Sequence, residues 1–287
     1  MNHRYLVFGA SGTVGSQIVR ELSAGGAQVR AVTSRKQAAG TREGIEWVHA
    51  DLATGAGVAE TFDGVHRAFI LVPPGYADQY AIAAPLIAHA ARLGLDKVVL
   101  MTAMGANAAE TPLLRAERAL IASGVAYNII RPNWFMQNFQ TFWIQGINQE
   151  GKILLPAGRA KASFIDARDI AAAAVRLLTS HDLDNRDFDL TGPRALDHDE
   201  VARILSKASG REIAYEEIAP ETLRRGLVAG NVPADYADFL VAILGFLAQG
   251  YAERTTGEVR RLIGREPIAF EQYARDNAQA WKAARAA

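Results

Sequence analysis

The sequence predicts an α/β protein: a doubly wound parallel sheet joined to a smaller, mainly helical C-terminal domain that binds substrate. Two observations predict it. Short apolar runs alternate with helical patterns through the first half of the 287 residues, as strands joined by crossover helices require. After Pro132 the alternation stops, and the rest of the chain shows mainly helical patterns with a few short strand-like pieces.

Six apolar runs are predicted as the parallel strands of the first domain. They lie at residues 5–8, 29–33, 46–49, 67–72, 97–102 and 127–131. Helical patterns are predicted at 13–23, 77–93 and 112–123. Glycines stand after helices, where a left-handed C-cap favours them, at Gly25-Gly26, Gly64, Gly94 and Gly124. Strands and helices in this order form a Rossmann domain.

The second half is predicted to divide into fewer regular elements. A long aromatic helix is expected from 133 to about 149, then a short apolar stretch at 152–156, a helix at about 169–178 and a strand at 188–190. From 197 onward helices dominate, with one strand-like piece near 213–216. The Rossmann domain is therefore expected at 1–132, completed by about 164–192. Residues 133–163 and 193–287 form the smaller lid domain, and the cleft between the two is the expected active site.

A glycine-rich turn follows the first strand and opens the first helix. Gly9, Gly12 and Gly15 have the spacing Gly-xx-Gly-xx-Gly, with Ser11, Thr13 and Val14 between them. A tight turn, a close backbone approach and a helix N-terminus together suit a pyrophosphate. The pattern indicates a dinucleotide site; the alternative is an ordinary glycine-rich strand-to-helix turn.

The end of the second strand indicates which dinucleotide binds. An NAD-preferring site usually has an acidic residue there, to hold both ribose hydroxyls. This chain has Ser34, Arg35 and Lys36 instead. Two cations and a hydroxyl can bind a 2′-phosphate, so NADP(H) is expected in preference to NAD(H). A solvated basic loop is the alternative.

The composition excludes several classes of protein. Lys and Arg number 31 against 31 Asp and Glu, which argues against a general nucleic-acid or membrane-surface partner. No apolar run has the length of a membrane span, and no secretory signal is evident. The absence of cysteine excludes disulfides, thiolate nucleophiles and Cys-based metal sites. We expect a cytoplasmic protein.

The chain resembles the NmrA-like branch of the atypical short-chain dehydrogenases, and within it the flavin-independent quinone, triphenylmethane-dye and azo-dye reductases. The resemblance covers essentially the whole chain. Its markers are the glycine turn and the segments Ala50-Asp51-Leu52, Leu71-Val72-Pro73-Pro74, Arg131-Pro132-Asn133-Trp134-Phe135-Met136-Gln137-Asn138, Phe164-Ile165-Asp166-Ala167-Arg168-Asp169-Ile170 and Leu262-Ile263-Gly264.

The resemblance implies positions along the nucleotide. It places Asp51 and Leu52 beside the adenine. It also places Leu71, Val72 and Pro73 beside the ribose and pyrophosphate. Thr102 and Ala103 would lie near the nicotinamide, whose far side would be shaped by Arg131, Pro132 and Asn133. It further implies hydride transfer without flavin.

The catalytic residue is left open by the sequence. Ordinary short-chain dehydrogenases use a Tyr-xxx-Lys pair, whereas none of the eight tyrosines here has lysine four residues later. Where some relatives have a lysine, the segment reads Leu114-Arg115-Ala116-Glu117. Thr102, Asn133 and Glu117 are the candidates. The preferred interpretation of Glu117 is a helix-surface glutamate paired with a nearby arginine.

An aromatic stripe follows the last nucleotide-binding strand. Trp134, Phe135, Phe139, Phe142 and Trp143 have helical spacing, which is typical of a core or, beside a cleft, of a pocket wall. The predicted substrate pocket comprises Asn133, Trp134, Phe135, Asn138 and Phe139, and Gln137 and Asn138 would supply its polar contacts.

Three patterns that suggest chemistry are better explained by structure. Asp166 and Asp169 are interpreted as helix caps, and Asp197 with Glu200 as a capping box rather than a metal cluster. Gly146-xxxx-Gly151-Lys152 imitates a phosphate loop but follows a helix and ends in Ile153. The scattered histidines have no ligand spacing, so no metal is expected.

Together these features predict an NADPH-dependent reductase. It transfers hydride directly to an electron-poor aromatic or conjugated small molecule: a quinone, a dye cation, an azo compound or an imine. Such acceptors need little acid assistance. The alternative is a non-catalytic NADP(H)-sensing regulator that binds a protein partner, and a weaker one is an isomerase. A monomer or a homodimer is expected.

Overall fold

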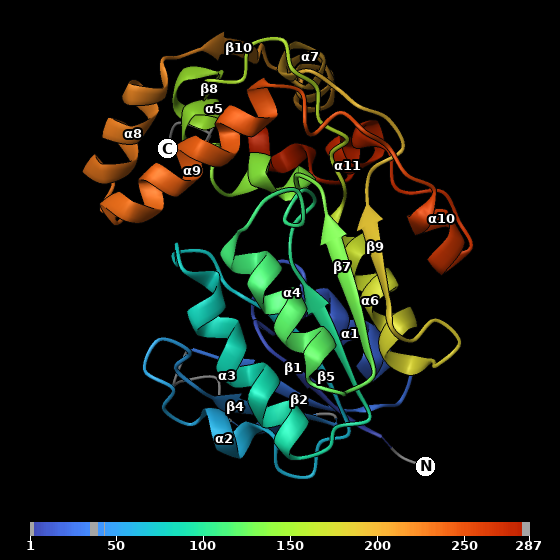
Figure 1. The fold of residues 1–287 in the computed structure, drawn as a ribbon. Helices are drawn as coiled ribbons and strands as arrows, with labels where there is room; N and C mark the ends of the chain where they lie inside the picture. Colours follow the sequence, from blue (N-terminus) through green and yellow to red (C-terminus); the bar gives the residue numbers. More distant parts are fainter. Residues whose placement is uncertain (1–2, 35–39, 43, 283–287) are drawn as a thin grey trace. The chain divides into compact units, whose positions relative to one another are not determined.

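The computed structural model describes residues 3–34, 40–42 and 44–282, and it divides into two compact units (Figure 1). The sheet unit comprises Met1–Pro132, Ala167–Leu190 and Arg261–Gly264. The helical unit comprises Asn133–Asp166, Thr191–Arg260 and Arg265–Ala287. Both units are therefore assembled from segments that lie far apart in the sequence.

The sheet unit is built on a mostly parallel sheet, which confirms the predicted doubly wound fold. Its strand order is β3-β4-β2-β1-β5-β6-β7-β9. The parallel strands are β1 (Arg4–Val7), β2 (Gln28–Thr33), β4 (Ile45–His49), β5 (Arg67–Leu71), β6 (Lys97–Met101), β7 (Tyr127–Pro132) and β9 (Arg186–Leu190). The short edge strand β3 (Gly40–Arg42) pairs antiparallel with β4 and was not predicted.

Helices cover both faces of this sheet. Helices α3 (Gln79–Arg92) and α4 (Pro112–Ala122) pack together on one face, and α1 (Gly15–Ala24) packs with α6 (Ala167–Thr179) on the other (Figure 1). Each buries an apolar stripe; in α1 it is Ile18, Val19 and Leu22. The one-turn helix α2 (Val58–Thr61) was not predicted. The glycines after the helices have the expected left-handed backbone at Gly26, Gly64, Gly94 and Gly124.

Buried polar side chains at the amino ends of the strands hold the loop that leads into β9. Lys97 Nζ donates to the carbonyl of Ser180 at 2.8 Å and to Asp184 Oδ1 at 2.5 Å. Arg67 donates to the carbonyl of Leu178 at 2.6 Å. Asn128 bonds the same loop. Burial lowers the pKa of Lys97, whereas Asp184 opposes that shift. Side chains at the starts of β5, β6 and β7 thus hold the loop that places β9 beside β7.

The helical unit contains small elements around one apolar core. They are η2 (Met136–Gln140), α5 (Ile144–Glu150), β8 (Lys152–Leu155), α7 (His198–Ser209), β10 (Ala214–Glu217), α8 (Pro220–Ala229), α9 (Ala234–Ala248), α11 (Phe270–Asp276) and η3 (Ala278–Trp281). Helix α10 (Glu258–Ile263) ends among the residues of the sheet unit. Strands β8 and β10 pair in parallel, with Lys152 opposite Ala214.

The long helix predicted from 133 to about 149 is wrong. Trp134 lies in a bend and Phe135 is extended beside Ile165: Met136 N donates to the carbonyl of Ile165 and Ile165 N donates to that of Trp134, both at 2.9 Å. Regular structure then resumes as η2 and α5. Aromatic residues have modest helix propensity, so this local pairing prevails.

Two interpretations of polar sequence patterns are confirmed. Asp197 caps α7 by accepting from Glu200 N at 2.7 Å, while the Glu200 carboxylate accepts from Asp197 N at 3.1 Å. Gly151 is the left-handed C-cap of α5, with φ 69°, so the segment that imitates a phosphate loop is the end of a helix. Helix α6 begins at Ala167, directly after Asp166 and earlier than predicted.

A histidine lies in the aromatic core of the helical unit. His198 is wholly buried, and its ring lies 5.3 to 6.3 Å from the rings of Tyr215, Phe164, Trp143 and Phe139. Neither ring nitrogen has a hydrogen-bond partner among the described residues. Burial lowers the pKa of His198 to about 4, and nearby Asp197 only partly opposes this shift. The imidazole is therefore neutral in the folded protein at neutral pH.

Replacing Asp197 with alanine should lower the free energy of unfolding by about 1 kcal/mol, because one backbone donor of α7 loses its acceptor. Urea denaturation measures this loss. Asp199→Ala is the control, since Asp199 lies in the same first turn of the helix but does not cap it. Equal losses in the two variants would contradict the assigned cap.

The folded protein should lose stability as the pH falls from about 6.5 toward 4. The unfolded chain takes up a proton on His198 in this range while the folded chain does not, so the full stabilisation exists only above the unfolded pKa. The difference between the ordinary histidine pKa of 6.5 and the folded pKa of about 4 corresponds to a loss of about 3 kcal/mol. Denaturation of the wild type and of His198→Leu across this range measures the difference. Parallel curves for the two proteins would show that His198 does not cause the loss.

Candidate functional site

The glycine turn after β1 is packed too tightly for side chains. Gly9 has φ 65°, and a Cβ there would lie 3.0 Å from Leu71 Cδ1. A Cβ on Gly15 would lie only 2.2 Å from the carbonyl oxygen of Gly9. The turn is closed by a hydrogen bond from Gly12 N to that same carbonyl, at 2.9 Å. Helix α1 therefore starts directly against the end of β1, which only glycine at position 15 allows.

The turn leaves three backbone donors unpaired in the part of the chain that the structure describes. Among the described residues, the backbone N–H groups of Thr13, Val14 and Gly15 have no hydrogen-bond acceptor. Ser11, Gly12 and Thr13 are exposed, while Val14 and Gly15 are buried. Unpaired N–H groups at the positive end of a helix can hold phosphate oxygens. The residues present therefore fit a pyrophosphate, although α1 begins at Gly15 rather than at Thr13 as predicted.

The end of β2 lies beside this turn. Ala10 N donates to the carbonyl of Val32 at 3.0 Å, and the hydroxyls of Ser11 and Thr33 are 3.2 Å apart. Ser34 is exposed at this end. Arg35 and Lys36, the predicted selectors of a 2′-phosphate, lie outside the described residues.

The next strand ends carry the other predicted nucleotide contacts. Asp51 follows β4, and its Oδ1 accepts from Ala53 N and Thr54 N at 2.9 and 3.3 Å. These backbone bonds lower the pKa of Asp51, so the carboxylate is fixed and ionised. Leu52, Val72 and Pro73 are half-buried, whereas Leu71 is buried and Ala103 is exposed. All follow or end parallel strands of one sheet, so they belong to one edge of it.

A buried ion pair joins helix α4 to strands β6 and β7. Glu117 Oε1 accepts from Arg131 Nε at 2.9 Å, and Oε2 accepts from Arg131 Nη2 at 2.7 Å. Thr102 Oγ1 donates to Glu117 Oε1 at 2.6 Å. All three residues are at most 7% exposed. Arg131 also bonds Asp187 and reaches Asp189 at 3.5 Å, both on β9.

This network bears on two expectations about Glu117: that it lies on the helix surface and that it is a candidate catalytic acid. Glu117 is paired with an arginine as expected, but it is buried rather than on the helix surface. Burial opposes the charge on Arg131, yet Glu117 and Asp187 outweigh it and raise the pKa of Arg131. A carboxylate held by a permanent cation has no proton to give, so Glu117 is not suited to be an acid. The Thr102 hydrogen is likewise engaged.

Asn133, predicted as a catalytic candidate and a pocket residue, is buried in the helical unit. Its Nδ2 donates to Ser163 Oγ at 2.6 Å and to the carbonyl of Ala252 at 2.7 Å, and its Oδ1 accepts from Trp134 N at 2.9 Å. Both of its N–H donors are used inside the protein. We call this set of bonds the Asn133 bracket.

The predicted aromatic pocket wall is mainly core. Phe139 is wholly buried against Phe164, Phe270 and Trp143, so it has no surface to offer a ligand. This corrects its assignment to the pocket, since the surface of its ring is covered by other aromatic rings of the helical unit. Phe142, by contrast, is 56% exposed.

The remaining predicted pocket residues are partly accessible. Trp134, Phe135 and Asn138 are half-buried. Gln137 donates to Asp166 Oδ1 at 3.1 Å and is also half-buried.

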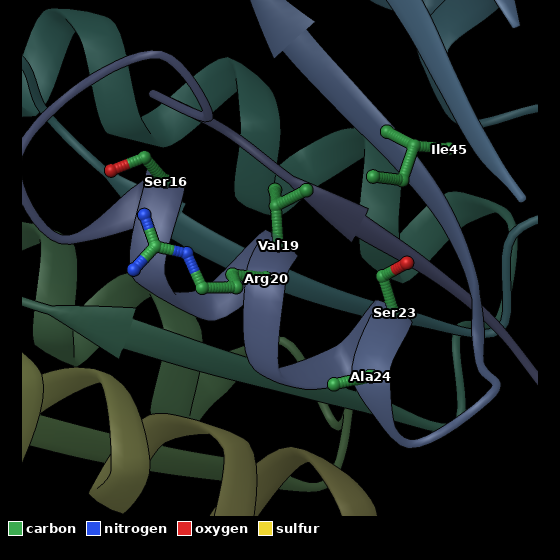
Figure 2. Close-up of a pocket in the computed structure, with 6 residues that line it drawn as sticks. All are labelled: Ser16, Val19, Arg20, Ser23, Ala24 and Ile45. Atoms are coloured by element: carbon green, nitrogen blue, oxygen red, sulfur yellow. The ribbon is translucent and has the colours of Figure 1, made fainter. Parts of the chain in front are cut away.

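A shallow hollow lies on the outer side of α1. Ser16, Val19, Arg20, Ser23 and Ala24 line it from the helix, and Ile45 lines it from the start of β4 (Figure 2). Its lining includes none of the residues predicted to bind the nucleotide. In the described chain, no three His, Cys, Asp or Glu side chains are grouped to hold a metal ion. None of the described helices has the length and apolar character needed to cross a bilayer.

Comparison with known proteins agrees with this geometry. The model of the NmrA-like family matches residues 1–274. The chain belongs to the NmrA-like family. It is 32% identical to the uncharacterized oxidoreductase YesF of Bacillus subtilis, over 96% of each chain. It is also 32% identical to an NAD(P)H azoreductase of Xenophilus azovorans, over 97% of this chain and 99% of that one.

A solved structure shares the fold. Triphenylmethane reductase of Citrobacter sp., complexed with NADP(H), superposes with a TM-score of 0.82 at 23% identity, over 96% of this chain and 99% of that one. The predicted family is thus confirmed, and this NmrA-like protein is an oxidoreductase.

The Thr102–Glu117–Arg131 network was missed by sequence reasoning as a unit. A signal existed, because Glu117 shares the buried face of α4 with Ala116 and Leu120. A charged residue on an apolar helix face requires a buried partner. Arg131, at the end of the predicted strand 127–131, could have been proposed as that partner.

Replacing Gly15 with alanine should destabilise the protein by about 1–3 kcal/mol, because the new methyl group meets backbone that cannot give way. It should also weaken nucleotide binding by displacing the start of α1. Gly25→Ala is the control at the other end of the helix, where a Cβ stays 3.4 Å from its nearest neighbour. Guanidinium denaturation and nucleotide titration of both variants provide the measurement, and full tolerance of Gly15→Ala would contradict the tight packing.

Proposed function

We propose that this protein is a reductase that uses NADPH to reduce an electron-poor aromatic or conjugated small molecule. The observation that carries the proposal is the turn at residues 9–15, with three backbone N–H groups unpaired at the start of α1. The azoreductase relative, named for NAD(P)H, supports a nicotinamide nucleotide as the reductant, without distinguishing NADPH from NADH. When bound, NADPH supplies a hydride.

The chain's own residues would mainly bind and orient. The N–H groups of Thr13, Val14 and Gly15 would hold the pyrophosphate, and Asp51 and Leu52 would border the adenine. Ser34, Arg35 and Lys36 would bind the 2′-phosphate and so favour NADP(H) over NAD(H). No flavin or metal is part of the proposal. Orientation alone can supply a large share of the rate when the acceptor is held at near-attack distance.

We infer the class of acceptor from the lack of a recognisable side chain that could donate a proton to it. No tyrosine is followed by lysine four residues later. Glu117 accepts from Arg131 and Thr102 donates its hydrogen to Glu117, so neither can donate a proton to a substrate. A ketone needs a proton delivered as negative charge develops on its oxygen. Quinones, azo compounds, iminium-like dye cations and conjugated imines accept hydride with less assistance. The proposal includes a small-molecule partner, a cytoplasmic location and a monomer or homodimer.

Mixing the protein with NADPH and a panel of quinones, cationic dyes, azo dyes and cyclic imines should give saturable loss of absorbance at 340 nm with one class. NADH is run in parallel. Gly15→Ala is the matched control, because it should lose turnover with the whole panel. Tight NADPH binding without turnover of any class would instead favour the alternative, a nucleotide-sensing regulator.

Replacing Arg35 with alanine should raise the KM for NADPH at least tenfold while changing that for NADH less than twofold. The reason is that a charge-assisted contact to the 2′-phosphate is lost, and NADH has no such group. Steady-state kinetics with both nucleotides measure the split. Arg92→Ala removes the same charge from the far end of α3 and should change neither value. Equal effects of Arg35→Ala on both nucleotides would refute the proposed selectivity.

A further inference from the structure

The hydrogen-bond polarity of Thr102 is fixed by the buried network. Both oxygens of Glu117 accept from Arg131, whose guanidinium stays protonated in proteins. Glu117 is therefore a carboxylate, and a carboxylate only accepts hydrogen bonds. The Thr102 hydroxyl, 2.6 Å from Glu117 Oε1, must then be the donor. Its single hydrogen faces Glu117, and only its lone pairs remain for any other group.

Thr102 lies where a nucleotide bound at the glycine turn would extend. It directly follows β6, and the sheet order places β5 between β6 and β1. Two strand spacings correspond to about 10 Å along the sheet edge. This is the scale that separates the pyrophosphate of a dinucleotide from its far half. Thr102 N donates to the carbonyl of Ile130 at 3.0 Å, so β7 fixes its backbone.

A group that meets Thr102 Oγ1 must bring its own N–H or O–H. Quinone oxygens, azo nitrogens and imine nitrogens have only lone pairs to offer, so they cannot bond to it. The nicotinamide half of the nucleotide carries suitable donors, namely its carboxamide NH₂ and its ribose hydroxyls. Because Thr102 Oγ1 can only accept, its partner is more readily the cofactor than the molecule that is reduced.

We propose that Thr102 accepts a hydrogen bond from the nicotinamide half of NADP(H), and that Glu117 is the positioning residue that enforces this polarity. The inference rests on the proposed function for the identity of the nucleotide. It assigns Glu117 a role through Thr102 and Arg131 rather than through contact with a ligand. It also assigns the proton that completes reduction to solvent, since neither side chain can release one.

The test is the binding of NADP⁺ and of its 3-acetylpyridine analogue, which lacks the carboxamide NH₂, measured by isothermal titration calorimetry. Thr102→Val removes the hydroxyl with little change of shape and should weaken NADP⁺ binding about tenfold, as expected for one lost hydrogen bond. Thr102→Ser keeps the hydroxyl and should bind within about twofold of the wild type.

The analogue separates the two possible donors. If the carboxamide is the donor, the wild type prefers NADP⁺ to the analogue and Thr102→Val loses that preference. If a ribose hydroxyl is the donor, Thr102→Val weakens both ligands by the same factor. Either result supports the inference, whereas wild-type affinity of folded Thr102→Val for both ligands overturns it.

Glu117→Gln tests the positioning role. An amide has one donor and one acceptor end, so it no longer forces Thr102 to donate as the carboxylate does, and NADP⁺ binding should weaken although the hydroxyl is retained. Because both changes act on one hydrogen bond, Thr102→Val combined with Glu117→Gln should bind no more weakly than the weaker single variant. Additive losses would indicate a merely structural role for Glu117 and would overturn its assignment.

Two outcomes distinguish this inference from the proposed function. A wild-type protein that binds neither nucleotide would overturn both. A wild-type protein that binds NADP⁺ and is unaffected by Thr102→Val would overturn the Thr102 inference alone. If Glu117→Gln fails to fold, Thr102→Val still decides the matter, because it leaves the Glu117–Arg131 ion pair in place.

Discussion

The approach of α1 to the end of β1 is the constraint on which the sheet unit depends. With no side chain at Gly15, the first turn of the helix rests against the Gly9 carbonyl. The helix then packs its Ile18, Val19 and Leu22 stripe onto the sheet, and α6 packs beside it. The same contact places the positive end of the helix at the strand ends. Fold stability and anion binding are therefore set by one backbone contact.

A second feature gives this protein its chemical character. The buried Glu117–Arg131 pair costs desolvation, and a well-packed apolar pair could replace it with little loss of stability. Its specific effect is to hold a neighbouring hydroxyl in one orientation. The proposed role of this orientation is to separate the binding of the cofactor from the supply of a proton, in a chain that lacks the Tyr-xxx-Lys pair of ordinary short-chain dehydrogenases. The proposed acceptors are accordingly those that need little acid assistance.

Much of the sheet unit could be predicted because its signals are local. Apolar runs, glycine C-caps and the turn at 9–15 each depend on nearby residues, and the six strands appear where they were expected. The edge strand β3 has only three residues and no apolar pattern, so no local signal marked it. The capping box of α7 was likewise predicted, since Asp197 and Glu200 are three residues apart.

The helical unit and the candidate catalytic residues were harder because their partners are distant in sequence. The bend at Trp134 and the extended Phe135 depend on hydrogen bonds with Ile165, and the burial of Phe139 depends on Phe164 and Phe270. Helical spacing could not show whether these rings meet each other or a ligand. Glu117 was expected on the surface for the same reason, because its burial on helix α4 depends on Arg131 of strand β7.

The Asn133 bracket has a consequence for the order in which the protein is made. Asn133 bonds the carbonyl of Ala252, which is synthesised 119 residues later. The first six parallel strands of the sheet unit are complete once Pro132 has left the ribosome. The helical unit can be completed only after nearly the whole chain has been synthesised, and until then Phe139 and Phe164 lack their aromatic neighbour Phe270 of α11. During translation these rings are exposed apolar surface of the kind that is prone to aggregation.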